Sequence, residues 1–79
     1  MKLWQLGRKG DYTYDEAMSF VVCADNREEA RRVASKNHGD EGAEVWLSDR
    51  KTYCWLLGIP SPRYSKRKAY IVVKDFWNA

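Results

Sequence analysis

A chain of 79 residues, 44% of them hydrophobic and 14% aromatic, is too short for two separate cores and too apolar for a disordered protein, so we expect one folded domain over residues 1–79. Its 14 Lys and Arg against 11 Asp and Glu give a net charge of +3, which only tilts the chain toward acidic partners. The sequence has neither the roughly 18 apolar residues of a membrane span nor the apolar stretch of a signal peptide, so we expect a cytoplasmic protein.

Two strands are predicted in the first third of the chain. Residues 2–7 mix Leu and Trp with polar neighbours and end in a turn-like Gly-rich stretch, which indicates a strand and a loop. The alternation is clearest in residues 18–24, where one face carries Phe20, Val22 and Ala24. Because the opposite face is also apolar, we expect this second strand to be central in its sheet.

A helix is predicted to follow over residues 26–38. Asp25 is the expected N-cap and Glu28 stands where a capping box requires an acid. Gly39 provides a C-terminal stop. The inward face, at helical spacing, consists of Ala30, Val33, Ala34 and Asn37. These side chains are small, so the helix should pack closely on larger side chains of a sheet.

Three further strands are predicted in the second half. Residues 43–48 and 52–57 indicate a hairpin closed by a polar turn, and residues 69–76 a last strand after a Gly- and Pro-containing break. The first of these strands alternates Val45 and Leu47 with Glu44 and Trp46.

The order strand, strand, helix, strand, strand, strand predicts an α+β fold: a mainly antiparallel four- to five-stranded sheet with one α-helix on one face. One short helix leaves the other face uncovered, yet the chain carries 4 Trp, 5 Tyr and 2 Phe. Some rings should therefore lie on the uncovered face or its edge. We expect Trp46, Tyr53, Trp55 and Tyr70 there, and Trp4, Phe20 and Phe76 in the core.

Catalytic and metal-binding residues are sparse in this sequence. His38 is the one histidine, and it lacks the close spacing to Cys23 and Cys54 that a metal site needs. The acids fall in caps, turns and helix surface, and no nucleotide-binding glycine motif is present. We therefore expect no enzyme, metal or cofactor. The two cysteines would form a disulfide only if their strands are neighbours.

Basic residues gather in two turns. Residues 63–68 carry four cations around Tyr64, and Arg50 and Lys51 occupy another turn. Three interpretations stay open for them: a solvated loop, contact with a phosphate backbone while Tyr64 stacks on a base, or contact with an acidic protein surface. The basic helix positions should form an ordinary exposed face paired with Glu28 and Glu29. The candidate partner-binding residues are Trp46, Arg50, Lys51, Tyr53, Trp55, Arg63, Tyr64, Lys66, Arg67 and Lys68.

Residues 20–34, a strand that runs into a capped helix, are followed by Gly39 and Gly42. This stretch resembles small proteins of phages and other mobile elements, among them compact one-helix, sheet-based anti-CRISPR proteins that inhibit type I effector complexes. Residues 46–49 and 75–76 add to the resemblance, which covers under a third of the chain. It implies a stoichiometric inhibitor that binds the Cascade complex and blocks target-DNA binding or nuclease recruitment, and it assigns no functional residue.

The sequence thus predicts a non-enzymatic, protein-binding inhibitor of phage or mobile-element origin, with an anti-CRISPR protein as its sharpest version. The alternative is a small basic nucleic-acid-binding accessory protein that uses residues 63–68. An uncovered sheet face would also suit a homodimer. No membrane association is expected.

Overall fold

The computed structural model describes residues 1–10, 16–62 and 68–77, with the side chains of the last two left undescribed. The elements in chain order are β1 (Lys2–Arg8), β2 (Glu16–Ala24), α1 (Arg27–Ser35), α2 (Ala43–Leu47), β3 (Thr52–Gly58) and β4 (Tyr70–Trp77). Within these described ranges, no helix is long and apolar enough to cross a membrane.

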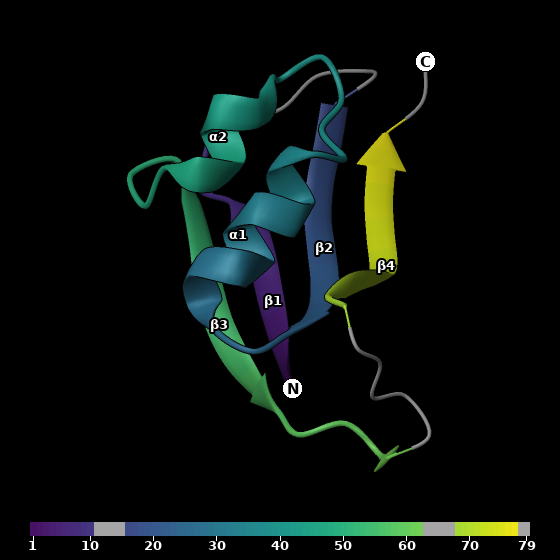
Figure 1. Cartoon of the computed structure of the whole chain (residues 1–79). Helices are drawn as coiled ribbons and strands as arrows, with labels where there is room; N and C mark the ends of the chain where they lie inside the picture. The colour runs from purple at the N-terminus through teal and green to yellow at the C-terminus, as the bar shows by residue number, and fades with distance from the viewer. Residues whose placement is uncertain (11–15, 63–67, 78–79) are drawn as a thin grey trace.

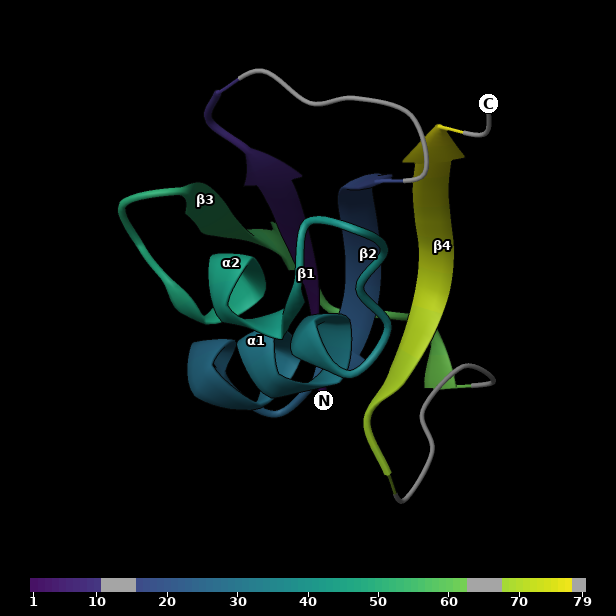
Figure 2. The same ribbon diagram turned by 90° about the horizontal axis from the view of Figure 1, so that it is seen from above.

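The four strands form one antiparallel sheet in the order β3-β1-β2-β4, and both helices lie on the same face of it (Figure 1). The view from above also places both helices on one side (Figure 2). The predicted α+β class is confirmed, and β2 occupies the central position expected from its two apolar faces. The strands β3 and β4 are consecutive in the chain but form opposite edges of the sheet.

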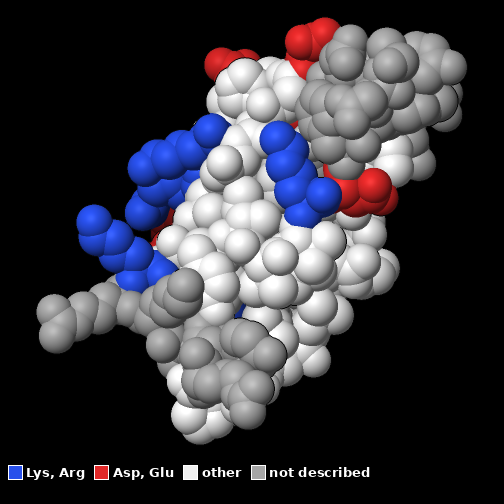
Figure 3. Space-filling model, turned by 90° about the vertical axis from the view of Figure 1, so that its right-hand side faces the viewer, with Lys and Arg blue, Asp and Glu red and all other residues white. Residues whose placement is uncertain are grey.

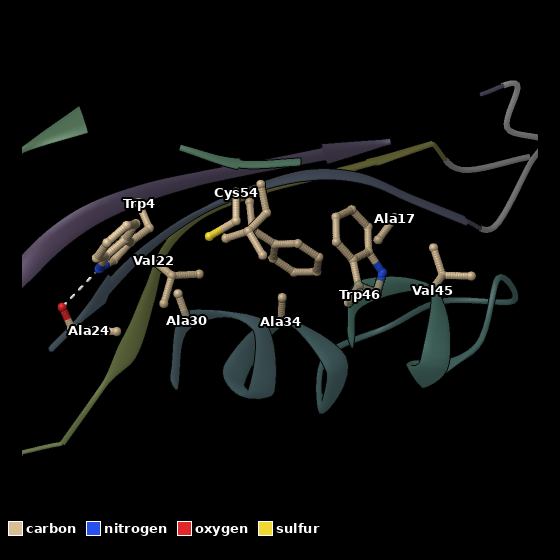
Figure 4. Packing of buried hydrophobic residues seen from close by; sticks show 11 residues of the cluster. Trp4, Ala17, Val22, Ala24, Ala30, Ala34, Val45, Trp46 and Cys54 are labelled. Carbon is tan, nitrogen blue, oxygen red and sulfur yellow. Dashed lines mark hydrogen bonds between the residues drawn. The ribbon is translucent and has the colours of Figure 1, made fainter. Parts of the chain in front are cut away.

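The core fills the space between the helices and the sheet (Figure 4). Ala30 and Ala34 of α1 are fully buried, and their small size lets the helix approach the strands closely. The ring of Trp46 from α2 packs edge-on against Phe20, with 4.7 Å between ring centroids. The other buried members of this cluster are Trp4, Leu6, Ala17, Val22, Ala24, Val45 and Cys54. Trp4 and Phe20 are core residues as predicted, whereas the side chain of Phe76 lies outside the described residues.

The start of α1 is one residue later than predicted. The N-cap is Asn26, whose side chain accepts a hydrogen bond from the Glu29 amide at 2.8 Å, and the Glu29 carboxylate accepts one from the Asp25 amide at 3.0 Å. The physical reason lies in β2: Ala24 is still paired with Lys2 in the sheet, so the chain needs two further residues to turn into the helix.

The helix also ends earlier than predicted, at Ser35 instead of residue 38. Asn37 is exposed and donates its side-chain amide to the Val33 carbonyl at 2.8 Å. The expected inward position of Asn37 is therefore wrong, because the helical spacing no longer applies beyond Ser35. Ala30, Val33 and Ala34 do pack toward the core.

The strand predicted over residues 43–48 is wrong: Ala43–Leu47 is a short helix, so the observed order is β-β-α-α-β-β. Val45 and Trp46 are both buried, while Leu47 is 54% exposed. Side chains at neighbouring strand positions point to opposite faces, so a strand packed over one face of the sheet could not turn both Val45 and Trp46 toward the core, whereas a helix can. The α2 helix is stabilised by tertiary contacts, since the Arg31 side chain donates to the carbonyls of Trp46 and Ser48 at its C-terminal end.

Glu41 holds the loop between the helices onto the sheet. Its carboxylate accepts hydrogen bonds from the backbone amides of Ala17 and Gly39, both at 2.9 Å, and from the indole nitrogen of Trp46 at 2.5 Å. Although partial burial alone would raise the pKa of Glu41, the hydrogen bonds from Trp46, Ala17 and Gly39 bring it below its ordinary value of 4.5. The charged form of Glu41 therefore stabilises the fold.

Replacing Glu41 with Gln should reduce the free energy of unfolding at pH 7 by about 1 kcal/mol, because the charge-assisted bonds are lost at a partly solvent-exposed site. The pKa of this carboxyl is lower in the folded than in the unfolded protein, so its contribution is complete above the unfolded value and is lost as pH falls through the folded value. Urea unfolding of both proteins from pH 7 to pH 3 measures this. The gap between them should close at low pH; a gap that is constant over the whole range contradicts the assigned role.

Candidate functional site

The face of the sheet opposite the helices, here named the open face, carries large apolar side chains in contact with solvent. Alternation along the strands places Tyr53 and Trp55 of β3 on it, together with Val73 of β4. Trp55 is 61% exposed and Val73 is 54% exposed. In a single chain of this size, such residues gathered on one face indicate a binding surface more than scattered apolar residues do.

Tyr53 is held against the sheet by a glycine beneath it. A Cβ atom built on Gly7 would lie only 2.3 Å from the Tyr53 hydroxyl and 2.4–2.6 Å from two atoms of its ring, so the phenol group covers the glycine backbone directly. The same ring stacks on Trp55, with centroids 4.3 Å apart and an interplanar angle of 31°. Glycine at this strand position thus leaves room for the Tyr53 ring to pack on the backbone, and the Tyr53 ring orients the more exposed ring of Trp55.

Irregular pairing increases the apolar exposure at both edges. The register of β2 with β4 shifts between Val21 and Val22, so Val72 is an extra residue between the paired Ile71 and Val73. Ile71 packs against the core, and Val72 is 47% exposed beside Val73. A similar shift in β3 leaves Leu57 without a partner on β1, and Leu57 is 51% exposed.

The three cross-strand rows of the open face contain one charged side chain among the described residues, Asp75. The rows are Tyr53–Gly7–Ser19–Asp75, Trp55–Gln5–Val21–Val73 and Gly58–Leu3–Cys23–Tyr70. An open depression of about 400 Å³ lies at one end, lined by Leu3, Ile59, Pro60, Ser61 and Val72. Seen from the β4 edge, residues other than Lys, Arg, Asp and Glu make up most of the described surface (Figure 3). The open face is therefore suited to an apolar contact.

Two arginines of α1 bind the edge strand β3. Arg27 donates to the Cys54 carbonyl at 3.1 Å, and its guanidinium lies 5.5 Å from the centre of the Trp4 ring. Arg31 donates to the Thr52 side chain at 2.7 Å and to the Thr52 carbonyl at 3.2 Å. The expectation of an ordinary exposed helix face is thus wrong for Arg31, which is partly buried. Because these carbonyls are occupied, the start of β3 is protected against addition of another strand.

The four rings predicted on the uncovered face have different outcomes. Tyr53 and Trp55 lie on the open face as expected, and Tyr70 does so through its pairing with Cys23. Trp46 was expected there as well, which is wrong: it is fully buried, because the helix that carries it turns its ring toward Phe20. The binding role of the residues on the open face stays a prediction.

The predicted basic residues do not form one site within the described part of the chain. Arg50 and Lys51 are exposed next to the start of β3, whereas Lys68 is exposed before the start of β4. These two strand starts lie at opposite ends and opposite edges of the sheet (Figure 1). The remaining candidates, Arg63, Tyr64, Lys66 and Arg67, lie outside the described residues.

The cysteines and the histidine are not brought together. Both cysteines are buried as free thiols, on strands that β1 separates, so the condition for a disulfide is not met. Burial raises the pKa of Cys54 in spite of the nearby Arg31 and Arg27. His38 is exposed, with its Nδ1 2.6 Å from the Gly39 carbonyl. Among the described residues no group of three potential ligands could hold a metal ion.

Leu57, Val72, Val73 and the packing of Tyr53 on Gly7 were not predicted from the sequence. One signal was available: Leu56 and Leu57 directly follow Trp55, and three consecutive apolar residues in an edge strand leave some of them exposed. The register shift that exposes Val72 has no sequence signal, because it depends on how β4 pairs with β2.

Comparisons of the chain with protein-family models, with curated proteins and with solved structures found no match.

Replacing Gly7 with Ala should destabilise the fold by about 1–2 kcal/mol, because the added methyl group displaces the Tyr53 ring. Urea unfolding measures the loss, and Gly10→Ala, where a Cβ would meet no atom within 4 Å, is the control.

The cause can be isolated by combining Gly7→Ala with Tyr53→Ala. With the ring removed, the alanine at position 7 should cost little or nothing, because its methyl group then has room. An equal cost in both backgrounds would show that the ring and the glycine are independent.

Proposed function

We propose that this chain is a non-enzymatic protein whose open face docks onto another protein. The observation that carries the proposal is the Tyr53–Trp55 pair: a ring that is 61% exposed, stacked on a second ring that is seated on a glycine. Trp and Tyr are the side chains that most often dominate the binding energy of protein interfaces.

The pair is ordered before any partner arrives. A flexible side chain loses about 0.5–1.5 kcal/mol of conformational freedom when an interface immobilises it. Trp55 already has its ring stacked at 4.3 Å on Tyr53, so less freedom remains to be lost. Leu57, two residues along β3 from Trp55, adds exposed apolar surface near this anchor, and Val72 and Val73 add more at the opposite edge of the sheet, on β4. Apolar side chains are enriched at the centre of an interface.

The charges favour a different protein over nucleic acid or a second copy. The open-face rows offer no cation among the described residues, and cations on phosphates supply most of the affinity for nucleic acid. Two copies would each bring a net charge of +3 and repel, whereas an acidic partner would be attracted. The partner we propose therefore has an apolar patch with acidic groups around it.

The sharpest version of this function is inhibition of a type I CRISPR effector complex. A small protein with an ordered aromatic anchor is suited to stoichiometric inhibition, because it needs only to occupy a surface. Support for the choice of partner comes only from the sequence resemblance, which rests on residues 20–34 with Gly39 and Gly42 and on residues 46–49 and 75–76. Two experiments test this version. The immobilised chain should capture purified Cascade, and it should inhibit DNA binding or cleavage by the effector until the effector is in excess.

Replacing Trp55 with Ala should weaken partner binding by about 2 kcal/mol, or roughly 30-fold in Kd, because the anchor of the interface is removed. Biolayer interferometry against purified type I effector complexes measures it. Leu47→Ala is the matched control: Leu47 is 54% exposed but lies on α2, on the helix side of the sheet.

Equal binding by the two variants would place the interface elsewhere. If the chain captures no effector subunit, the anti-CRISPR version is wrong. Light scattering then decides between the remaining partners: a dimer that Trp55→Ala dissociates would identify the open face as a contact between copies.

A further inference from the structure

Four cationic side chains border one depression at the end of the sheet where β1 ends and β3 begins. The depression has a volume of about 280 Å³ and is lined by Arg8, Lys9, Gly10, Arg50 and Lys51. It lies beyond the last residues of two neighbouring strands, and none of its lining residues belongs to the apolar rows of the open face. It is therefore a separate site from the proposed protein interface.

The backbone that carries these cations is fixed on both sides of the depression. Arg8 is paired with Thr52 at the last position of the ladder, and the Lys9 amide donates to the Lys51 carbonyl at 2.9 Å. The Lys9 ammonium donates to the Asp49 carbonyl at 2.7 Å, which positions this charge near the turn. The Arg50 amide is bound to the Ser48 hydroxyl at 3.2 Å. The cations are thus gathered by the fold itself.

The described acids offset only part of this charge. Glu16 forms an ion pair with Arg8 at 3.6 Å, and Asp49 stands in the turn, but neither lines the depression. Asp11 and Asp15 lie outside the described residues. Lys9, Arg50 and Lys51 are exposed, so three cationic groups are accessible to a ligand. Grouping like charges is unfavourable unless an anion binds between them.

We propose that this basic depression binds phosphoryl groups, either of a free polyphosphate or of a nucleic-acid backbone. Guanidinium and ammonium donors together match the several oxygens and double charge of a phosphoryl group better than a single carboxylate. The volume is just below the roughly 300–1,000 Å³ of typical small-molecule pockets, which favours a small, highly charged group. The apolar open face and the basic depression would then serve two different ligands.

Isothermal titration with sodium pyrophosphate at fixed ionic strength, using the whole chain, tests the site. The double variant Arg50→Gln and Lys51→Gln should bind at least 10-fold more weakly, while the control Arg32→Gln and Lys36→Gln, which removes the same charge from the exposed surface of α1 and its C-cap, should bind as the wild type does. All four side chains are exposed, so folding should be preserved, and circular dichroism checks this.

Fluorescence anisotropy with a labelled single-stranded oligonucleotide separates the two sources of phosphate. Oligonucleotide binding that falls with salt and is lost in the Arg50 and Lys51 variant supports a nucleic-acid backbone. Pyrophosphate binding without oligonucleotide binding supports a free polyphosphate. The proposal is overturned if neither probe binds, or if the site variant and the control variant lose affinity equally.

Discussion

The packing of Trp46 between the helices and the sheet is the interaction on which the rest of the structure depends. Its ring is fully buried against Phe20, and its indole nitrogen is bound by Glu41. Through this contact the short α2 helix joins α1 on one face of the sheet, and the loop between them is fixed to β2. One face of the sheet therefore carries the core. Among the described side chains, the exposed ring of Trp55 lies on the other face.

The arginines of α1 complete this arrangement. Arg31 bonds α2 to the start of β3, and Arg27 bonds Cys54 in the same strand. These side chains act within the fold, where they satisfy backbone carbonyls that would otherwise face solvent at an edge. At the basic depression, Arg8 and Lys9 contact Glu16 and the Asp49 carbonyl, whereas Arg50 and Lys51 are exposed. The structure therefore separates basic residues that stabilise the fold from basic residues that are accessible to a ligand, a distinction that the net charge does not reveal.

Local patterns sufficed for much of the fold. The alternation in β2, the acids at the start of α1 and the small residues Ala30 and Ala34 each depend on neighbours within a few positions, and each prediction was close to the observed structure. The exact cap was missed because Asp25 and Asn26 are both good caps, and the pairing of Ala24 with Lys2 decides between them.

The errors concern residues whose state is set by distant partners. In residues 43–47 the polar and apolar positions fit a strand, but the Arg31 side chain, 15 positions from Trp46, and the Glu41 carboxylate in the loop before the helix stabilise a helix there. For the same reason the site was found only in part. Tyr53 and Trp55 follow from alternation, whereas Trp46 was misplaced, and Val72 and Gly7 depend on cross-strand register. Arg8 and Lys9 become neighbours of Arg50 and Lys51 only through the pairing of β1 with β3.

The central claim is that one sheet face is covered and the other is open, with Trp46 and Trp55 on opposite sides. Solvent paramagnetic relaxation of the indole N–H signals in an NMR spectrum tests this most directly. A soluble gadolinium agent should broaden the Trp55 signal strongly and leave those of Trp46 and Trp4 nearly unchanged, because the latter two are buried and hydrogen-bonded to Glu41 and Ala24. A Trp55 signal protected as well as that of Trp46 in the monomer would contradict the account.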